Sequence, residues 1–242
     1  MYAEREGQDS AAPLVLLHGG IGTGRYHWSK LVRPLAERWH VHLPDLPGHG
    51  RTPLPADGSY TRGVLVDAVE RYLTDLDGPV HVAAFSMGGQ AALDLATRRP
   101  AVFASLTLVG VSIREHEGLT AWRTEFDPDR LESQYPVWAK HLAGLHAPQG
   151  GDDAWKDVCR RDAAGLEVRV DVEALTALRC PVLLVRGDRD PAVDPTHYAE
   201  LRRVLARDEE LVVPAGRHEV QLTRHRIVGP ALTDFLRRAG GS

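Results

Sequence analysis

Residues 80–96 read VHVAAFSMGGQAALDLA, which is the pattern of a buried strand that turns at a serine into a helix. A serine held on such a sharp turn crowds its neighbours, so the residues two before and two after it must be small. Ala84 and Gly88 meet this requirement around Ser86. A serine that merely caps a helix gives the same short pattern. The rest of the chain must therefore decide between a nucleophile and a cap.

Short apolar runs typical of β-strands recur along the chain, with longer helical patterns between them. Six of these runs are PLVLLHG, WHVHLPD, PVHVAAF, ASLTLVG, CPVLLVRG and EELVVPAG. Apolar residues at helical spacing occupy the connections at 26–38, 61–76, 86–98, 195–205 and 223–238. This βαβ alternation predicts an α/β fold, in which helices cover both faces of a mostly parallel central sheet.

The alternation stops between residues 112 and 176, where we find no strong strand pattern but several helical patches and three tryptophans. We interpret this segment as a small helical cap inserted into the core. The predicted domains are therefore a core formed by 1–111 and 177–242, and a cap formed by 112–176. A long segment without a sheet of its own is expected to cover the functional site and help to select its ligand.

Composition excludes several classes of function. The 242 residues are 43% hydrophobic and 26% charged with a formal net charge of -4, so we expect a soluble globular protein without affinity for nucleic acid. The apolar runs are too short to cross a membrane, and the first residues do not resemble a secretory signal. Cys159 and Cys180 match no metal or redox spacing, and His40 and His42 lack further ligands. We expect a cytoplasmic protein that needs no metal and no cofactor.

Four further motifs give the serine its context, and with them the chain resembles the α/β-hydrolase superfamily over nearly its whole length. They are LLHGG at 16–20, DLPGHGRT at 45–52, LLVRGDRDPAVD at 183–194 and VVPAGRHEV at 212–220. The resemblance implies that the family's usual first strand is absent, because the region before Pro13 has room only for one short antiparallel strand around residues 2–5. We assign the 45–52 turn, including His49, a structural role.

The resemblance also implies a catalytic triad of Ser86, Asp190 and His218. The acid of this family follows the glycine that ends its strand by three residues, which selects Asp190 over Asp188 and Asp194. The base lies in the loop after the last strand, where Arg217 takes the place of the usual glycine before His218. The order of nucleophile, acid and base along the chain is the one that this fold uses.

The same family implies an oxyanion hole made of the backbone N–H groups of Gly20 and Met87. The Met87 N–H would lie at the start of a helix, where free N–H groups and the helix dipole favour a developing negative charge. For the substrate pocket we name three tryptophans, Trp28, Trp122 and Trp138. Aromatic residues at helical spacing are equally consistent with core packing.

These residues predict a serine hydrolase that cleaves a carboxylic ester, lactone or thioester of a small, largely apolar substrate through an acyl-serine intermediate. Carbon–carbon bond hydrolases, lyases and cofactor-free perhydrolases of the same fold use similar triads and remain alternatives. A ligand-binding or receptor protein whose triad turns over slowly or never is the alternative from another class. The sequence does not determine the oligomeric state.

Overall fold

A seven-stranded sheet forms the centre of the protein, and the computed structural model describes residues 1–240. The strands lie in the order β1-β3-β2-β4-β5-β6-β7, and every neighbouring pair is parallel except the antiparallel pair β1 and β3. Their bounds are β1 Ala3–Glu6, β2 Pro13–Leu17, β3 His40–Pro44, β4 Val80–Phe85, β5 Phe103–Val109, β6 Val182–Gly187 and β7 Asp208–Val213. The predicted fold class is confirmed, and one short antiparallel strand precedes the first parallel strand, as expected.

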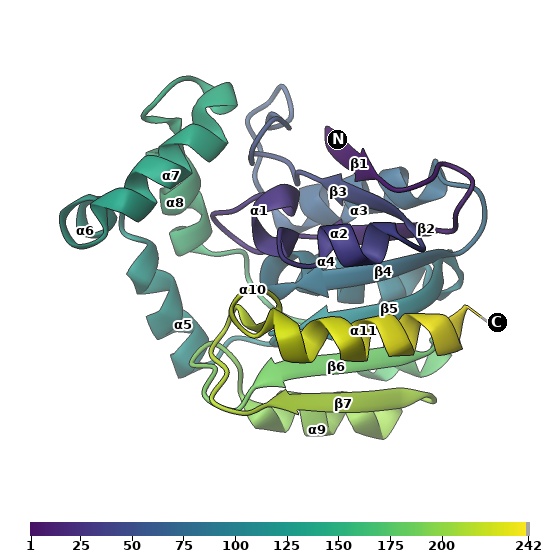
Figure 1. Cartoon of the computed structure of the whole chain (residues 1–242). Helices are drawn as coiled ribbons and strands as arrows, with labels where there is room; N and C mark the ends of the chain where they lie inside the picture. Colours follow the sequence, from purple (N-terminus) through teal and green to yellow (C-terminus); the bar gives the residue numbers. More distant parts are fainter. Residues whose placement is uncertain (241–242) are drawn as a thin grey trace.

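Helices cover both faces of this sheet, as Figure 1 shows. Helices α3, α4 and α9 pack on one face, and α1, α2 and α11 pack on the other. Their bounds are α1 Gly24–Trp28, α2 Val32–Ala36, α3 Arg62–Thr74, α4 Ser86–Arg98, α9 Pro195–Val204 and α11 His225–Ala239, with the short α10 Val220–Thr223 before α11. Two buried apolar clusters result, one on each side of the sheet. None of the helices in residues 1–240 has the length and apolar content that a bilayer-spanning helix requires.

The helix predicted over 26–38 is broken into α1 and α2. Pro34 explains the break, because proline has no N–H to donate to the carbonyl of Lys30 and its ring would clash there. A tight turn, in which Leu31 N–H donates to the Trp28 carbonyl at 2.8 Å, separates the two short helices. Pro34 then lies in the first turn of α2, where a missing N–H costs nothing.

The segment between β5 and β6 forms the helical cap, which projects beyond the carboxyl ends of the strands (Figure 1). Its helices are α5 Glu117–Arg123, α6 Pro128–Gln134, α7 Pro136–His146 and α8 Ala154–Ala164. Helices α6, α7 and α8 share a small apolar cluster, which includes Leu142 and Trp155. The last part of the expected range 112–176 packs elsewhere: Val170 and Leu175 belong to the core cluster under α4 and α9. The cap helices therefore end at Ala164.

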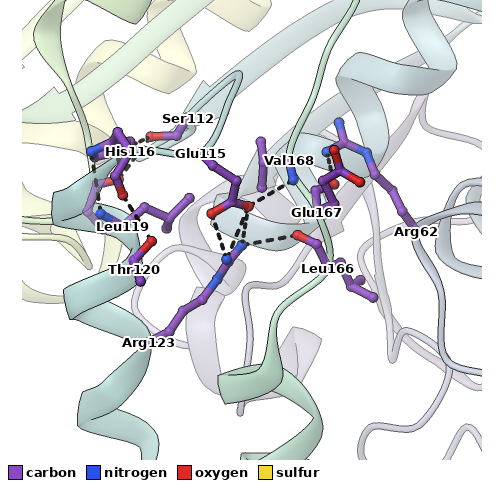
Figure 2. A network of polar contacts seen from close by, with 11 residues as sticks. Arg62, Ser112, Glu115, His116, Leu119, Thr120, Arg123, Leu166, Glu167 and Val168 are labelled. Carbon is purple, nitrogen blue, oxygen red and sulfur yellow. Dashed lines mark hydrogen bonds and ion pairs between the residues drawn. The ribbon is translucent and has the colours of Figure 1, made fainter.

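The chain enters and leaves the cap along a paired base. Glu115 N–H donates to the Val168 carbonyl at 3.1 Å, and Val170 N–H donates to the Ile113 carbonyl at 2.8 Å. Arg123 stabilises this pairing, because its guanidinium donates to both carboxylate oxygens of Glu115 at 2.9–3.1 Å (Figure 2). Entry and exit segments are thus held together as one unit.

Candidate active site

Ser86 is the first residue of α4, directly after β4, and its backbone adopts φ +48°. A non-glycine residue in this left-handed region is strained, and such strain is typical of functional turns. The turn brings Gly88 so close to the preceding loop that a Cβ on Gly88 would lie 2.5 Å from the His18 carbonyl oxygen. The small residue that the sequence pattern requires at this position is therefore needed for packing.

A hydrogen-bond relay joins Ser86, His218 and Asp190. His218 Nε2 lies 2.9 Å from Ser86 Oγ, and His218 Nδ1 lies 2.9 and 3.0 Å from the two Asp190 carboxylate oxygens. The His218 and Asp190 side chains are only 6% and 1% exposed, so water does not compete for this contact. An Nδ1–H donating to the carboxylate leaves Nε2 free to accept the serine proton.

Asp190 is the carboxylate that His218 contacts, and the two other local aspartates have different surroundings. Asp188 is exposed, whereas Asp194 caps α9 and accepts hydrogen bonds from Thr196 N–H and Oγ1. Arg217, which occupies the family's usual glycine position, is also exposed, and the positive φ of this loop falls on Ala215 instead. A glycine before His218 is therefore not required for the loop conformation.

The oxyanion hole expected from the sequence consists of the backbone N–H groups of two residues. Gly20 and Met87 both line the cavity beside Ser86. Neither N–H donates to another group within residues 1–240. The His18 ring holds the Gly20 loop in place: its Nδ1–H donates to the Gly19 carbonyl at 2.7 Å, and its Nε2 accepts from Leu46 N–H at 2.8 Å. Burial, with the nearby His49, lowers the His18 pKa well below its ordinary value, so this ring is neutral.

Core and cap residues together enclose an apolar cavity above Ser86 and His218. Its walls include Ile21, Tyr60, Phe85, Trp122, Phe126 and Trp138. The Trp122 ring meets the His218 ring edge-on, with centroids 5.3 Å apart. Two of the three tryptophans named from the sequence thus line the cavity.

Trp28 does not line the cavity, contrary to the expectation from the sequence. Its side chain is fully buried in the cluster between the sheet and α11, and its Nε1–H donates to the Leu17 carbonyl at 3.0 Å. The indole therefore belongs to the core: α1 lies against the sheet and turns this residue inward.

A buried carboxylate that was not predicted from the sequence links the cap to the loop that carries Gly20. Asp162 of α8 accepts hydrogen bonds from Ile21 N–H at 2.5 Å, from His49 Nε2 at 3.0 Å and from the Tyr60 hydroxyl. Burial alone would raise the Asp162 pKa, but the His49 charge and these hydrogen bonds outweigh burial and lower the pKa to about 2. His146 of α7 adds a contact between its Nε2 and the Ile21 carbonyl at 3.2 Å.

The sequence did contain a signal for Asp162. The buried face of α8 consists of residues 155, 158, 159 and 162, which is helical spacing, and the first three are apolar. A carboxylate within an apolar stripe must be hydrogen-bonded or paired. No group of three or more His, Cys, Asp or Glu side chains within residues 1–240 is arranged to hold a metal ion.

Comparison with known proteins finds a family match that covers most of the chain. Residues 14–229 match the model of the "Alpha/beta hydrolase family". The chain is 28% identical to a pimeloyl-[acyl-carrier protein] methyl ester esterase of Nitrosospira multiformis, over 90% of this chain and 91% of the relative. The enzyme of the same name from Aromatoleum aromaticum is 42% identical over 77% of this chain and 82% of its own length. A meta-cleavage product hydrolase of Pseudomonas fluorescens has a similar structure, with a TM-score of 0.81, 19% identity and coverage of 98% and 94%.

Proposed function

The chain belongs to the alpha/beta hydrolase family, and on that premise we propose that it hydrolyses the ester bond of a small, largely apolar substrate. Ser86 is the nucleophile, His218 the general base and Asp190 the acid that orients the imidazole. The observation that carries the proposal is the relay from Ser86 Oγ through His218 to Asp190 beside an apolar cavity. The esterase names of the two relatives support an ester as the bond cleaved.

Acylation begins when Ser86 Oγ attacks the ester carbonyl carbon while His218 Nε2 takes the serine proton. The hydroxyl is too weakly acidic to attack without this base. Asp190 stabilises the resulting imidazolium through Nδ1–H, at 2.9 Å. The carbonyl π bond breaks as the Ser86 Oγ–carbon bond forms, and the electron pair moves to the carbonyl oxygen.

The N–H groups of Gly20 and Met87 stabilise the negative charge on that oxygen. One such donor contributes about 3 kcal/mol to transition-state stabilisation. His218 then returns its proton to the leaving alkoxide, and the alcohol departs. A water molecule, deprotonated by the same imidazole, attacks the acyl-serine and releases the carboxylic acid product.

We propose that the cap, whose helices lie within residues 117–164, selects the acyl or alcohol group. Trp122, Phe126 and Trp138 come from this segment and form much of the apolar wall opposite Ser86. Removing one methylene from a substrate in such a pocket costs about 1–3 kcal/mol. The two similar esterases act on a methyl ester, so methyl esters of short apolar acids are the first substrates to test.

The test is Ser86→Ala, assayed with p-nitrophenyl butyrate and with a series of methyl esters. We expect turnover to fall roughly a millionfold, as it does when a triad loses its nucleophile. A fluorophosphonate probe should label Ser86 in the wild-type protein, as read by peptide mass spectrometry. Ser133→Ala, at an exposed position on α6, is the matched control and should keep full activity. Retained turnover in Ser86→Ala would refute the assignment, and a wild-type protein that neither labels nor hydrolyses would support the ligand-binding alternative.

A further inference from the structure

Three side chains that are charged at neutral pH line the cavity, and they differ in whether other groups already pair with them. They are Arg123, Asp162 and Glu219, and Arg123 is the single lysine or arginine in the lining formed by residues 1–240. The charge that remains unpaired determines which charged substrates the cavity can bind.

The Arg123 guanidinium is already paired with a carboxylate at the base of the cap. Its Nη1 donates to both Glu115 oxygens, and its Nη2 donates to Glu115 and to the Leu166 carbonyl, at 2.9–3.1 Å (Figure 2). A bidentate contact of this kind is the strong form of the arginine–carboxylate pair. A carboxylate substrate would have to compete with Glu115 for this guanidinium.

The Asp162 carboxylate is also fully hydrogen-bonded, because Ile21 N–H, His49 and the Tyr60 hydroxyl all donate to its two oxygens. Only 3% of its side chain is exposed. Asp162 thus presents no free oxygen to a ligand.

The Glu219 carboxylate is different, because 31% of its side chain is exposed and no lysine or arginine within residues 1–240 pairs with it. Its one close partner is His27 Nε2, 3.3 Å from Oε1. His27 Nδ1 is buried without a partner, and a Cβ on Gly22 would lie 2.6 Å from it, so a proton on Nδ1 would be unsatisfied. His27 therefore donates through Nε2.

Glu219 is ionised at neutral pH. Burial alone would raise its pKa, but the hydrogen bond from His27 and the nearby imidazoles lower the pKa below its ordinary value. Its second oxygen, Oε2, makes no hydrogen bond or ion pair with residues 1–240. A ligand can therefore bind this oxygen.

Aromatic rings surround the same cavity, in particular Trp122, Trp138 and Phe126. The faces of aromatic rings attract cations, and the attraction grows when the site is shielded from water. Aromatic walls together with a carboxylate that keeps one oxygen free are a combination suited to binding alkylammonium groups.

We propose that Glu219 and these rings form a subsite for an alkylammonium group, so that the enzyme prefers esters carrying a cationic amine close to the ester bond. This inference rests on the proposed ester hydrolysis. Anionic esters are disfavoured, because Glu219 repels them and Arg123 is occupied by Glu115.

The test compares two esters of the same shape, butyrylcholine and its neutral isostere 3,3-dimethylbutyl butyrate. We expect the wild-type kcat/KM to be about tenfold higher for the choline ester. In Glu219→Gln this ratio should fall towards one, and the ratio cancels any loss of activity common to both substrates. Glu117→Gln, which removes an exposed glutamate of α5 outside the cavity, is the matched control and should keep the wild-type ratio.

A wild-type preference for the neutral isostere would overturn the subsite, whether or not the Glu219 variant folds. An unchanged ratio in folded Glu219→Gln would also overturn it. If the wild-type protein hydrolyses neither ester, binding separates the two proposals: choline should quench tryptophan fluorescence of the wild-type protein, at concentrations about tenfold lower than Glu219→Gln requires. Choline binding without hydrolysis would support the subsite and count against the esterase, and absence of both would refute the subsite.

Discussion

Replacing Asp162 by asparagine tests the link between the cap and the loop that carries Gly20. The side chain is buried and accepts hydrogen bonds from Ile21 N–H, His49 and Tyr60. Its pKa falls from the ordinary 3.8 to about 2. Since one pKa unit corresponds to about 1.4 kcal/mol, the ionised carboxylate contributes about 2 kcal/mol to the free energy of unfolding at neutral pH.

The sign of the pH dependence follows from the direction of this shift. A carboxyl group whose pKa is lower in the folded protein stabilises the fold at every pH above its unfolded value. That contribution shrinks as the pH falls from about 4 towards 2, because the unfolded chain then binds a proton before the folded one does. The stability difference between wild type and Asp162→Asn should therefore be about 2 kcal/mol at pH 7 and about 1 kcal/mol at pH 3.

Urea denaturation between pH 3 and pH 8, followed by circular dichroism, measures this difference directly. Asp157→Asn is the matched control, because it removes a carboxylate from an exposed position of the same helix, α8. We also expect kcat of Asp162→Asn to fall more than KM changes, since Ile21 adjoins Gly20. A stability difference that stays constant with pH, or a kcat equal to that of the control, would refute the reasoning.

Two further predictions concern the triad and the cavity. Asp190→Asn should lower kcat by about four orders of magnitude through the wrong His218 tautomer, whereas Asp188→Asn should leave kcat unchanged; equal effects in esterase assays would contradict the assignment of the acid. Trp122→Ala should change the preference among acyl chain lengths, measured as kcat/KM, more than it changes the melting temperature. Trp28→Ala should lower the free energy of unfolding by about 3–5 kcal/mol and leave the preference among acyl chain lengths unchanged. A chain-length preference that changes in Trp28→Ala but not in Trp122→Ala would contradict the placement of both tryptophans.

Much of the architecture could be predicted because its signals are local. The strand runs and the helix at 86–98 are periodic patterns, and the structure has α4 over the same residues. The resemblance of motifs next to strand ends to the α/β-hydrolase superfamily implied the positions of Ser86, Asp190 and His218. The structure brings these three side chains into one relay. Their catalytic roles remain predictions until the variants are measured.

The features that the sequence did not predict depend on contacts between distant segments. Trp28 was wrongly expected in the pocket, because the sequence around it does not reveal which side of a short helix faces the sheet. Asp162 lies 141 positions from Ile21 along the chain, so no local pattern joins them. Glu219 adjoins His218 in sequence, but its free oxygen becomes evident only from the burial of His27 and the absence of a paired cation within residues 1–240.

The attachment of the cap has a consequence for recombination between members of the family. Its helices leave and rejoin the core through one paired base at residues 113–115 and 168–170, so a genetic exchange could replace the cap as a single block. Asp162 and His146 would leave with that block, and both hold Ile21 of the recipient core. A chimera that inherits a foreign cap would keep Ser86 and lose these contacts to the loop that carries Gly20. Grafting a new specificity onto this core therefore requires that the donor cap also carry these two anchors.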